Sequence, residues 1–315
     1  MNSIKKMMLS GALGCLISGM AYADGSSPQP VKPYWQDIQV VAVNKEKPRS
    51  SFMSYADRET ALTSRFEKSP YYSLLNGTWK FFFVDSYKDL PQNITDPSVN
   101  TSSWDDITVP GNWEVQGHGV AIYTNHGYEF KPKNPQPPLL PEANPVGVYR
   151  RDIEIPASWD NRDIYLHIGG AKSGLYVYLN GKEVGYSEDS KNPAEFLINK
   201  YLQPGKNVLT LKIFRWSTGS YLECQDFWRM SGIERDVFLW SQPKASIQDF
   251  RVVSTLDDTY TNGIFKLAVD LKNHTQETKN LNVGYELLDA KGNLMVSEAN
   301  DIWVSPCLLY TSDAA

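Results

Sequence analysis

Two carboxylates, Glu223 and Asp226, lie three residues apart in a segment rich in aromatic and charged side chains. The segment reads RWSTGSYLECQDFWRMSGIERDV and spans 215–237. Hydrolysis of a glycosidic bond uses two carboxyl groups about 5–9 Å apart across the bond that breaks. The spacing of Glu223 and Asp226 alone does not show that they face each other. An aromatic plug that closes the end of a β-sandwich is the alternative interpretation of this segment.

The residues around Asp226 also suit the binding of a sugar. Asp226 is flanked by Gln225, Phe227 and Trp228. Carboxylate and amide oxygens accept hydrogen bonds from sugar hydroxyls, and aromatic faces cover the apolar side of a pyranose ring. The flanking runs NVLTLKIF and VFLWS are typical of strands. A loop held between two strands is a frequent place for binding residues.

The sequence lacks the motifs of several other classes of active site. There is no HExxH or CxxC pair, no GxSxG elbow, no P-loop and no Rossmann glycine fingerprint. The histidines have no metal-ligand spacing; they are His118, His126, His167 and His274.

The first 23 residues are predicted to be a signal peptide. Lys5 and Lys6 form a positive n-region, an apolar stretch covers 7–20, and 21–23 is an A-x-A cleavage site. The apolar stretch is too short to span a membrane. We expect export to the periplasm. Lipid anchoring at Cys15 is the alternative, although the residue three positions before it is Ala12 and not the usual Leu.

Composition limits the partners and the redox chemistry. A length of 315 residues with 41% hydrophobic content leaves room for about two packed domains. Without Lys5 and Lys6, the 31 basic residues become 29 against 36 acidic ones, so the formal charge changes from −5 to −7. No basic patch stands out, and we expect no nucleic-acid partner. Without Cys15, only Cys224 and Cys307 remain, too few for a disulfide framework. Cys224 has no nearby His or Asn partner and is interpreted as a core or pocket-wall thiol.

Alternating apolar residues predict an all-β fold. Asn180-Gly181 between two short apolar runs predicts a type I′ hairpin. Turn signals about every 8–12 residues favour a sandwich or jelly roll over a parallel sheet. The predicted strands cover 79–84, 104–110, 149–155, 164–168, 175–179, 183–186 and 208–214, then 246–254, 263–272, 282–288 and 294–296.

A long run without strand pattern covers 111–149. It holds six of the 19 prolines and is rich in Gly, Asn and aromatic residues. Loops of this length inside a domain are usually functional or else linkers. Because strands resume on both sides, we expect a functional loop that neighbours the 215–237 segment.

A resemblance to a known family is carried by five segments: GTWKF, VPGNWEVQGHGVAIYTN, NPVGVYRRDIEIP, GLYVYLNGKEVGYSEDSKNPAEF and RWSTGSYLECQDFWRMSGIERDV. They resemble the large β-galactosidases of glycoside hydrolase family 2, and the similarity covers roughly 55–296. In that family an N-terminal jelly-roll sugar-binding domain precedes an immunoglobulin-like domain and a TIM barrel, which carries both catalytic glutamates. The resemblance implies that this chain is the N-terminal part of a retaining β-galactosidase and holds no catalytic residue itself.

Two substrate-binding residues follow from the resemblance. Asn112, in PGNW, matches an amide that reaches into the active site. Asp226, in QDFW, matches a carboxylate that binds galactose hydroxyls and a sodium ion. Glu223, Trp228 and Arg229 match positions that we interpret as structural. The resemblance also implies sodium, with magnesium in the full-length enzyme, no organic cofactor, a β-galactoside as partner, and a homo-oligomer at full length.

We therefore predict the following organisation. Residues 24–73 form a linker and a surface arm with a helical tendency at 57–66. A jelly-roll sugar-binding domain covers 74–241, and a truncated immunoglobulin-like β-sandwich covers 242–306, since a whole one needs about 100 residues. The final run, 307–315, does not continue the alternation and is interpreted as a non-native tail.

Two other functions stay open. A stand-alone carbohydrate-binding module would explain aromatic-rich loops without a complete catalytic set. β-Glucuronidase or β-mannosidase specificity is the alternative within the same enzyme family.

Overall fold

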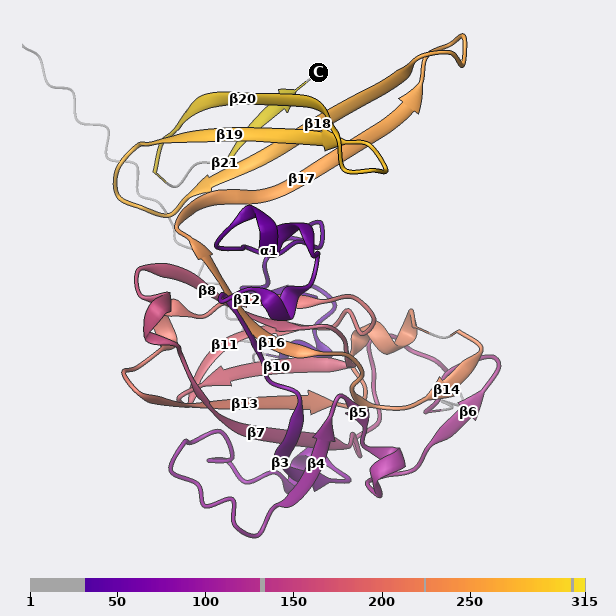
Figure 1. Ribbon diagram of the computed structural model, residues 1–315. Coiled ribbons are helices and arrows are strands. Elements are labelled where there is room, and N and C mark those ends of the chain that lie inside the picture. Colours follow the sequence, from indigo (N-terminus) through magenta and orange to yellow (C-terminus); the bar gives the residue numbers. More distant parts are fainter. Residues whose placement is uncertain (1–31, 131–133, 224, 307–308, 315) are drawn as a thin grey trace, which may run out of the picture. The chain divides into compact units, whose positions relative to one another are not determined.

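The computed structural model describes residues 32–130, 134–223, 225–306 and 309–314, the last of these by their backbone. The fold is all-β, as predicted, with a jelly-roll sandwich followed by a second β-sandwich (Figure 1). The predicted signal peptide, with Cys15, lies outside the described residues, and so do Cys224 and Cys307. Among the described residues no helix is both long and apolar enough to cross a membrane.

Two antiparallel sheets form the jelly roll. One contains β1 (Ala42–Val43), β3 (Gly77–Val84), β4 (Asp105–Val109), β7 (Val146–Glu154), β10 (Gly174–Leu179), β11 (Lys182–Ser187) and β13 (Lys206–Phe214), in the order β1-β11-β10-β13-β7-β3-β4. The other contains β2 (Tyr72–Leu74), β8 (Arg162–Ile168), β12 (Ala194–Leu197) and β16 (Val237–Pro243), in the order β12-β8-β16-β2. These strands confirm the predicted ones and extend most of them by one to three residues.

The core lies between the two sheets. Apolar side chains from both layers meet there, among them Phe81 and Leu211 from one sheet and Leu166 and Leu239 from the other. A second cluster covers the outer face of the larger sheet, so that β13 is buried along nearly its whole length. The type I′ hairpin is confirmed, because Asn180 and Gly181 both have positive φ, 53° and 78°.

The N-terminal arm is more closely packed than its polar composition indicated. Trp35 is 2% exposed and stacks on Phe214 with ring centroids 5.0 Å apart. Strand β1 pairs with β11 and β2 pairs with β16, so the arm extends both sheets. The helical tendency is confirmed by α1 (Arg58–Leu62), whose N-cap Asp57 accepts a hydrogen bond from the Thr60 backbone. A few buried aromatic residues attach the arm, and overall polarity did not reveal them.

The second sandwich follows Pro243. Its strands are β17 (Ala245–Leu256), β18 (Gly263–Asn273) and β21 (Leu309–Ala314) in one sheet and β19 (Lys279–Leu288) and β20 (Leu294–Val304) in the other. Val269, Leu271 and Val304 form its small core. The backbone of 309–314 pairs antiparallel with β18, and the interpretation of 307–315 as a non-native tail stays a prediction. Backbone pairing at a sheet edge needs no apolar alternation, which explains why the sequence pattern did not predict β21.

Short elements complete the described part of the chain. The 3-10 helices are η1 (Tyr34–Gln36), η2 (Phe66–Lys68), η3 (Tyr87–Asp89), η4 (Glu114–Gln116), η5 (Ala157–Trp159), η6 (Asn199–Tyr201) and η7 (Thr218–Tyr221). The remaining strands are β5 (Gly111–Asn112), β6 (Ile122–Thr124), β9 (Ala171–Lys172), β14 (Phe227–Arg229) and β15 (Gly232–Ile233).

Candidate functional site

The two long loops are paired with each other at one end of the jelly roll. In the 215–237 segment, β14 pairs with β6 and β15 pairs with β5, and both partner strands belong to the 111–149 loop. Figure 1 shows β6 and β14 as a ribbon beside the ends of the jelly-roll strands. This confirms the prediction that the two loops are neighbours.

Asp226 lies directly before β14, with its side chain exposed. The Tyr123 hydroxyl donates a hydrogen bond to Asp226 Oδ1 at 2.8 Å. This hydrogen bond raises the pKa of Tyr123, because the phenol is stabilised in its protonated, donating form. In the described part of the chain no other side chain binds the Asp226 carboxylate, so Oδ2 is free to accept a hydrogen bond.

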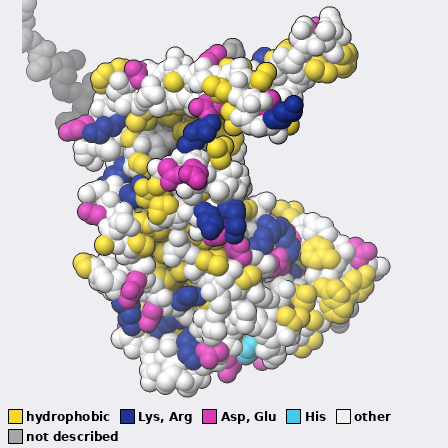
Figure 2. Space-filling view, in the orientation of Figure 1, with side chains coloured by type: hydrophobic (Ala, Val, Ile, Leu, Met, Phe, Trp, Pro, Cys, Tyr) yellow, Lys and Arg dark blue, Asp and Glu magenta, His cyan; other side chains and the backbone are white. Residues whose placement is uncertain are grey.

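Trp228 lies across the ribbon from Tyr123 in the strand register. The two rings are tilted with centroids 5.7 Å apart, and the side chains are 54% and 55% exposed. Figure 2 shows hydrophobic side chains gathered over this ribbon. The exposure of Trp228 does not fit our interpretation of it as a residue that holds the loop. Because side chains alternate along a strand, its neighbour Arg229 points inward and Trp228 points outward.

Asn112 lies on β5, opposite Gly232 of β15. Its side-chain Nδ2 donates to the Ser231 carbonyl at 3.1 Å, which leaves Oδ1 available. Gly232 has a φ of +108°, and a Cβ there would lie 2.9 Å from the Tyr149 hydroxyl, so glycine allows the two strands to approach. Among the described residues no hydrogen bond joins Asn112 to Asp226. They belong to successive strand pairs of the same two loops.

Glu223 and Asp226 bind different partners. Glu223 accepts hydrogen bonds from the backbone and the hydroxyl of Ser190, at 3.0 and 2.5 Å. Its carbonyl accepts from Arg229, which is 1% exposed. These contacts fit the interpretation of Glu223 and Arg229 as structural residues.

A buried ionic cluster supports the two loops, and the sequence reasoning missed it. Arg215 donates to the carbonyls of Val120 and Arg229, at 3.0 and 3.2 Å. Its guanidinium also lies 3.6 Å from Glu114 and from Glu129. Burial raises the pKa of Glu114, although the Ser231 backbone and Arg215 act against it.

Lys172 extends this cluster. Its ammonium group lies 2.7 Å from Glu129, and both side chains are buried. The residues of the cluster are separated by up to 101 residues along the chain, from Glu114 to Arg215. The sequence therefore showed only that charged residues occur within aromatic loops, and not that they meet. The cluster joins β6, β14 and the end of β5, and so it positions the segments that carry Asn112 and Asp226.

The Asp226 carboxylate would provide one part of a sodium site. Hard cations prefer several oxygen ligands. Within the described ranges no group of three or more His, Cys, Asp or Glu side chains could hold a metal ion. Asp226 thus fits as a single carboxylate ligand, and the other oxygens of such a site would come from a substrate or from elsewhere in the protein.

The comparisons with known proteins agree on one family. Residues 72–243 match the family described as glycosyl hydrolases family 2, sugar binding domain. A β-galactosidase from Priestia megaterium is 39% identical over 262 residues, which cover 82% of this chain and 25% of the relative. A β-galactosidase from Psychromonas ingrahamii is 36% identical over 257 residues, with 82% and 24% covered. The chain spans about a quarter of the length of the curated relatives it matches.

Solved structures share the fold. A Bacteroides uniformis β-glucuronidase has a TM-score of 0.62 and 20% identity, covering 77% of this chain and 27% of that chain. A glycosyl hydrolase family 2 member from Bacteroides cellulosilyticus has a TM-score of 0.56 and 15% identity, covering 77% and 31%. At these identities the similarity shows the fold alone.

Proposed function

Because this chain belongs to glycosyl hydrolase family 2, we propose that it is the carbohydrate-binding N-terminal part of a retaining β-galactosidase. The full-length enzyme would hydrolyse terminal non-reducing β-D-galactose residues. The names of the curated relatives support this specificity, and the matched PGNW and QDFW motifs support the site.

The observation that carries the proposal is the environment of Asp226. Its free carboxylate oxygen can accept a hydrogen bond from a sugar hydroxyl, and Tyr123 fixes the other oxygen. The exposed ring of Trp228 offers an apolar face nearby, as pyranose binding requires. Asn112 adds an amide oxygen on the adjoining strand pair. Such contacts raise the rate when they are stronger in the transition state than in the ground state.

The bond-breaking step would use residues outside this chain. In a retaining mechanism one carboxyl group attacks the anomeric carbon and the other first protonates the leaving group and then activates water. The family resemblance assigns both groups to a TIM barrel. The role of Asn112 and Asp226 is then to bind and orient galactose, and a sodium ion, when bound at Asp226, would supply positive charge toward its hydroxyls. We expect the chain alone to be inactive.

The remaining parts of the proposal concern location and assembly. The signal peptide predicted at 1–23 supports export to the periplasm. The family resemblance supports a homo-oligomer and magnesium as a cofactor of the full-length enzyme. Figure 2 shows acidic and basic side chains interspersed on the visible face.

A chromogenic β-galactoside assay tests the proposal. The full-length enzyme should turn the substrate over, and the 315-residue chain should not. Turnover by the purified chain would contradict the absence of catalytic residues. A gene that stops without encoding a barrel would favour the stand-alone carbohydrate-binding module.

A further inference from the structure

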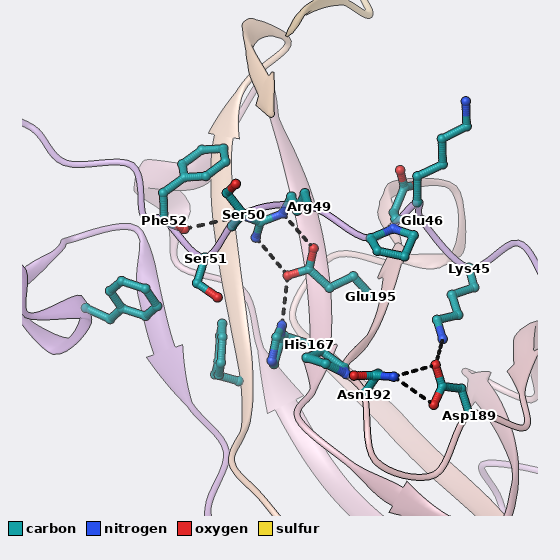
Figure 3. A pocket seen from close by; sticks show the side chains of 15 residues that line it. Lys45, Glu46, Arg49, Ser50, Ser51, Phe52, His167, Asp189, Asn192 and Glu195 are labelled. Carbon is teal, nitrogen blue, oxygen red and sulfur yellow. Dashed lines mark hydrogen bonds and ion pairs between the residues drawn. The ribbon is translucent and has the colours of Figure 1, made fainter. Parts of the chain in front are cut away.

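A pocket lies between the N-terminal arm and the four-stranded sheet of the jelly roll, away from the loops that carry Asn112 and Asp226. Figure 3 shows this pocket. Its volume is about 360 Å³, within the usual range for small-molecule sites. Aromatic side chains form much of its wall: Phe52 and Phe66 from the arm, Phe238 from β16 and His167 from β8.

Two charged side chains of this pocket, Arg49 and Glu195, form an ion pair with each other. Glu195 accepts two hydrogen bonds from Arg49, both at 2.9 Å, one from His167 Nδ1 at 2.8 Å and one from Trp240 at 3.1 Å. The remaining nitrogen of Arg49 donates to the Ser50 carbonyl at 3.0 Å. Most of the five N–H donors of the guanidinium are thus engaged within the protein.

Acceptors remain available in the pocket. His167 Nδ1 donates to the Glu195 carboxylate, so in the neutral imidazole the opposite nitrogen, Nε2, is an acceptor. The imidazole is held flat against Phe238, with ring centroids 4.2 Å apart. Asp189 is half-exposed and accepts from Asn192, yet its carboxylate has capacity for further donors.

Lys45 is already engaged, since it donates to Ser187 at 3.2 Å and lies 3.9 Å from Asp189. At the rim, Glu46 and Lys47 bring opposite charges. The pocket thus combines aromatic faces with hydrogen-bond acceptors. A fitting ligand has an apolar ring face and donates several hydrogen bonds.

We propose that this pocket is a second carbohydrate site, which binds a neutral hexopyranose. The ring's apolar face would lie on the phenylalanine wall, and its hydroxyls would donate to His167 Nε2 and to Asp189. A uronic acid would bring its carboxylate close to the Asp189 carboxylate, so it should bind more weakly than a neutral hexose. The site involves none of the residues of the proposed galactose site.

Saturation-transfer NMR on the 315-residue chain tests this inference, with D-galactose, D-glucose and D-glucuronate as probes. The chain should carry Asp226→Asn and Asn112→Ala, which remove the other site's ligands. We expect a neutral hexose still to bind, and Asp189→Ala and Phe66→Ala each to weaken it at least about fivefold, the scale of a lost charged hydrogen bond or stacking contact. Asp106→Ala is the matched control, because Asp106 is likewise exposed and paired to a lysine.

The outcomes separate the two sites. The second site would be overturned if no hexose bound to the chain that carries Asp226→Asn and Asn112→Ala. It would also be overturned if both pocket variants kept the Tm of the parent and bound the hexose with unchanged affinity. Glucuronate binding as tightly as the neutral hexoses would overturn the ligand class. Either result would leave the proposal for Asp226 untouched, since that one depends on turnover by the full-length enzyme.

Discussion

The Tyr123 hydroxyl donates a 2.8 Å hydrogen bond to Asp226 Oδ1, and so joins the two strands of the β6–β14 ribbon through their side chains. One carboxylate oxygen is thereby fixed and the other stays open. This contact gives the carboxylate a defined direction, although it lies on an exposed and narrow ribbon.

Tyr123→Phe should weaken galactoside binding while leaving the fold intact. Loss of the hydrogen bond would free the carboxylate to rotate, and we expect KM of the full-length enzyme to rise about threefold to tenfold. The free energy of unfolding should change by less than about 0.5 kcal/mol, as for other exposed positions. Tyr260→Phe is the control, because Tyr260 is also highly exposed. An unchanged KM would show that Tyr123 does not position Asp226.

Asp226→Asn and Asn112→Ala should each lower kcat/KM of the full-length enzyme. Both remove contacts to sugar hydroxyls, and the aspartate change also removes a charge; we expect a loss of about 2–4 kcal/mol for Asp226→Asn. Steady-state kinetics with a chromogenic galactoside measure this, with Asp106→Asn as an exposed control. If both variants stayed within twofold of the parent, the site assignment would be wrong.

Arg215→Met should destabilise the chain. The substitution leaves the carboxylates of Glu114 and Glu129 buried without their shared cation, a change that typically costs about 3–5 kcal/mol. Urea unfolding of the variant measures the cost. Arg65→Met provides the matched control, because the Arg65 pair with Glu67 is exposed to solvent and should contribute little to stability. Equal effects of the two substitutions would contradict the role given to the buried cluster.

The Arg49–Glu195–His167 contacts should make stability depend on pH. Burial alone would raise the pKa of Glu195, but the hydrogen bond from His167 and the charge of Arg49 outweigh it and hold the pKa below its usual 4.5. The stabilisation is thus fully present above pH 4.5 and is lost as the pH falls through the lower pKa of the folded state.

Glu195→Gln isolates this contribution. At pH 7 we expect the variant to lose about 3 kcal/mol of unfolding free energy, because Arg49 loses its buried partner. The difference in unfolding free energy between parent and variant should become smaller as the pH is lowered below 4.5. If this difference in unfolding free energy stayed constant down to pH 3, the pKa of Glu195 would be the same in the folded and the unfolded state.

The strands and the two long loops between them could be predicted from sequence because their signals are local. Alternation and Asn-Gly turns marked β10, β11 and β13, and the irregular 215–237 segment between two strands marked a loop. The role of Asp226 came from its motif, since one exposed carboxylate has no pattern of its own.

Long-range contacts were not predictable in this way. Arg215, Glu114 and Glu129 meet only after the loops pair, and nothing in their spacing indicates this. Trp228 was interpreted as structural from the family position that it matches, whereas the strand register turns its side chain to solvent.

Substrate choice by the full-length enzyme tests the central claim most directly. The kcat/KM for a chromogenic β-galactoside should be compared with that for the matching β-glucuronide and β-mannoside. The account predicts that the galactoside exceeds both by at least about 100-fold, as expected for sites that hydrogen-bond a specific hydroxyl. A glucuronide or mannoside that is hydrolysed as efficiently as the galactoside would contradict it.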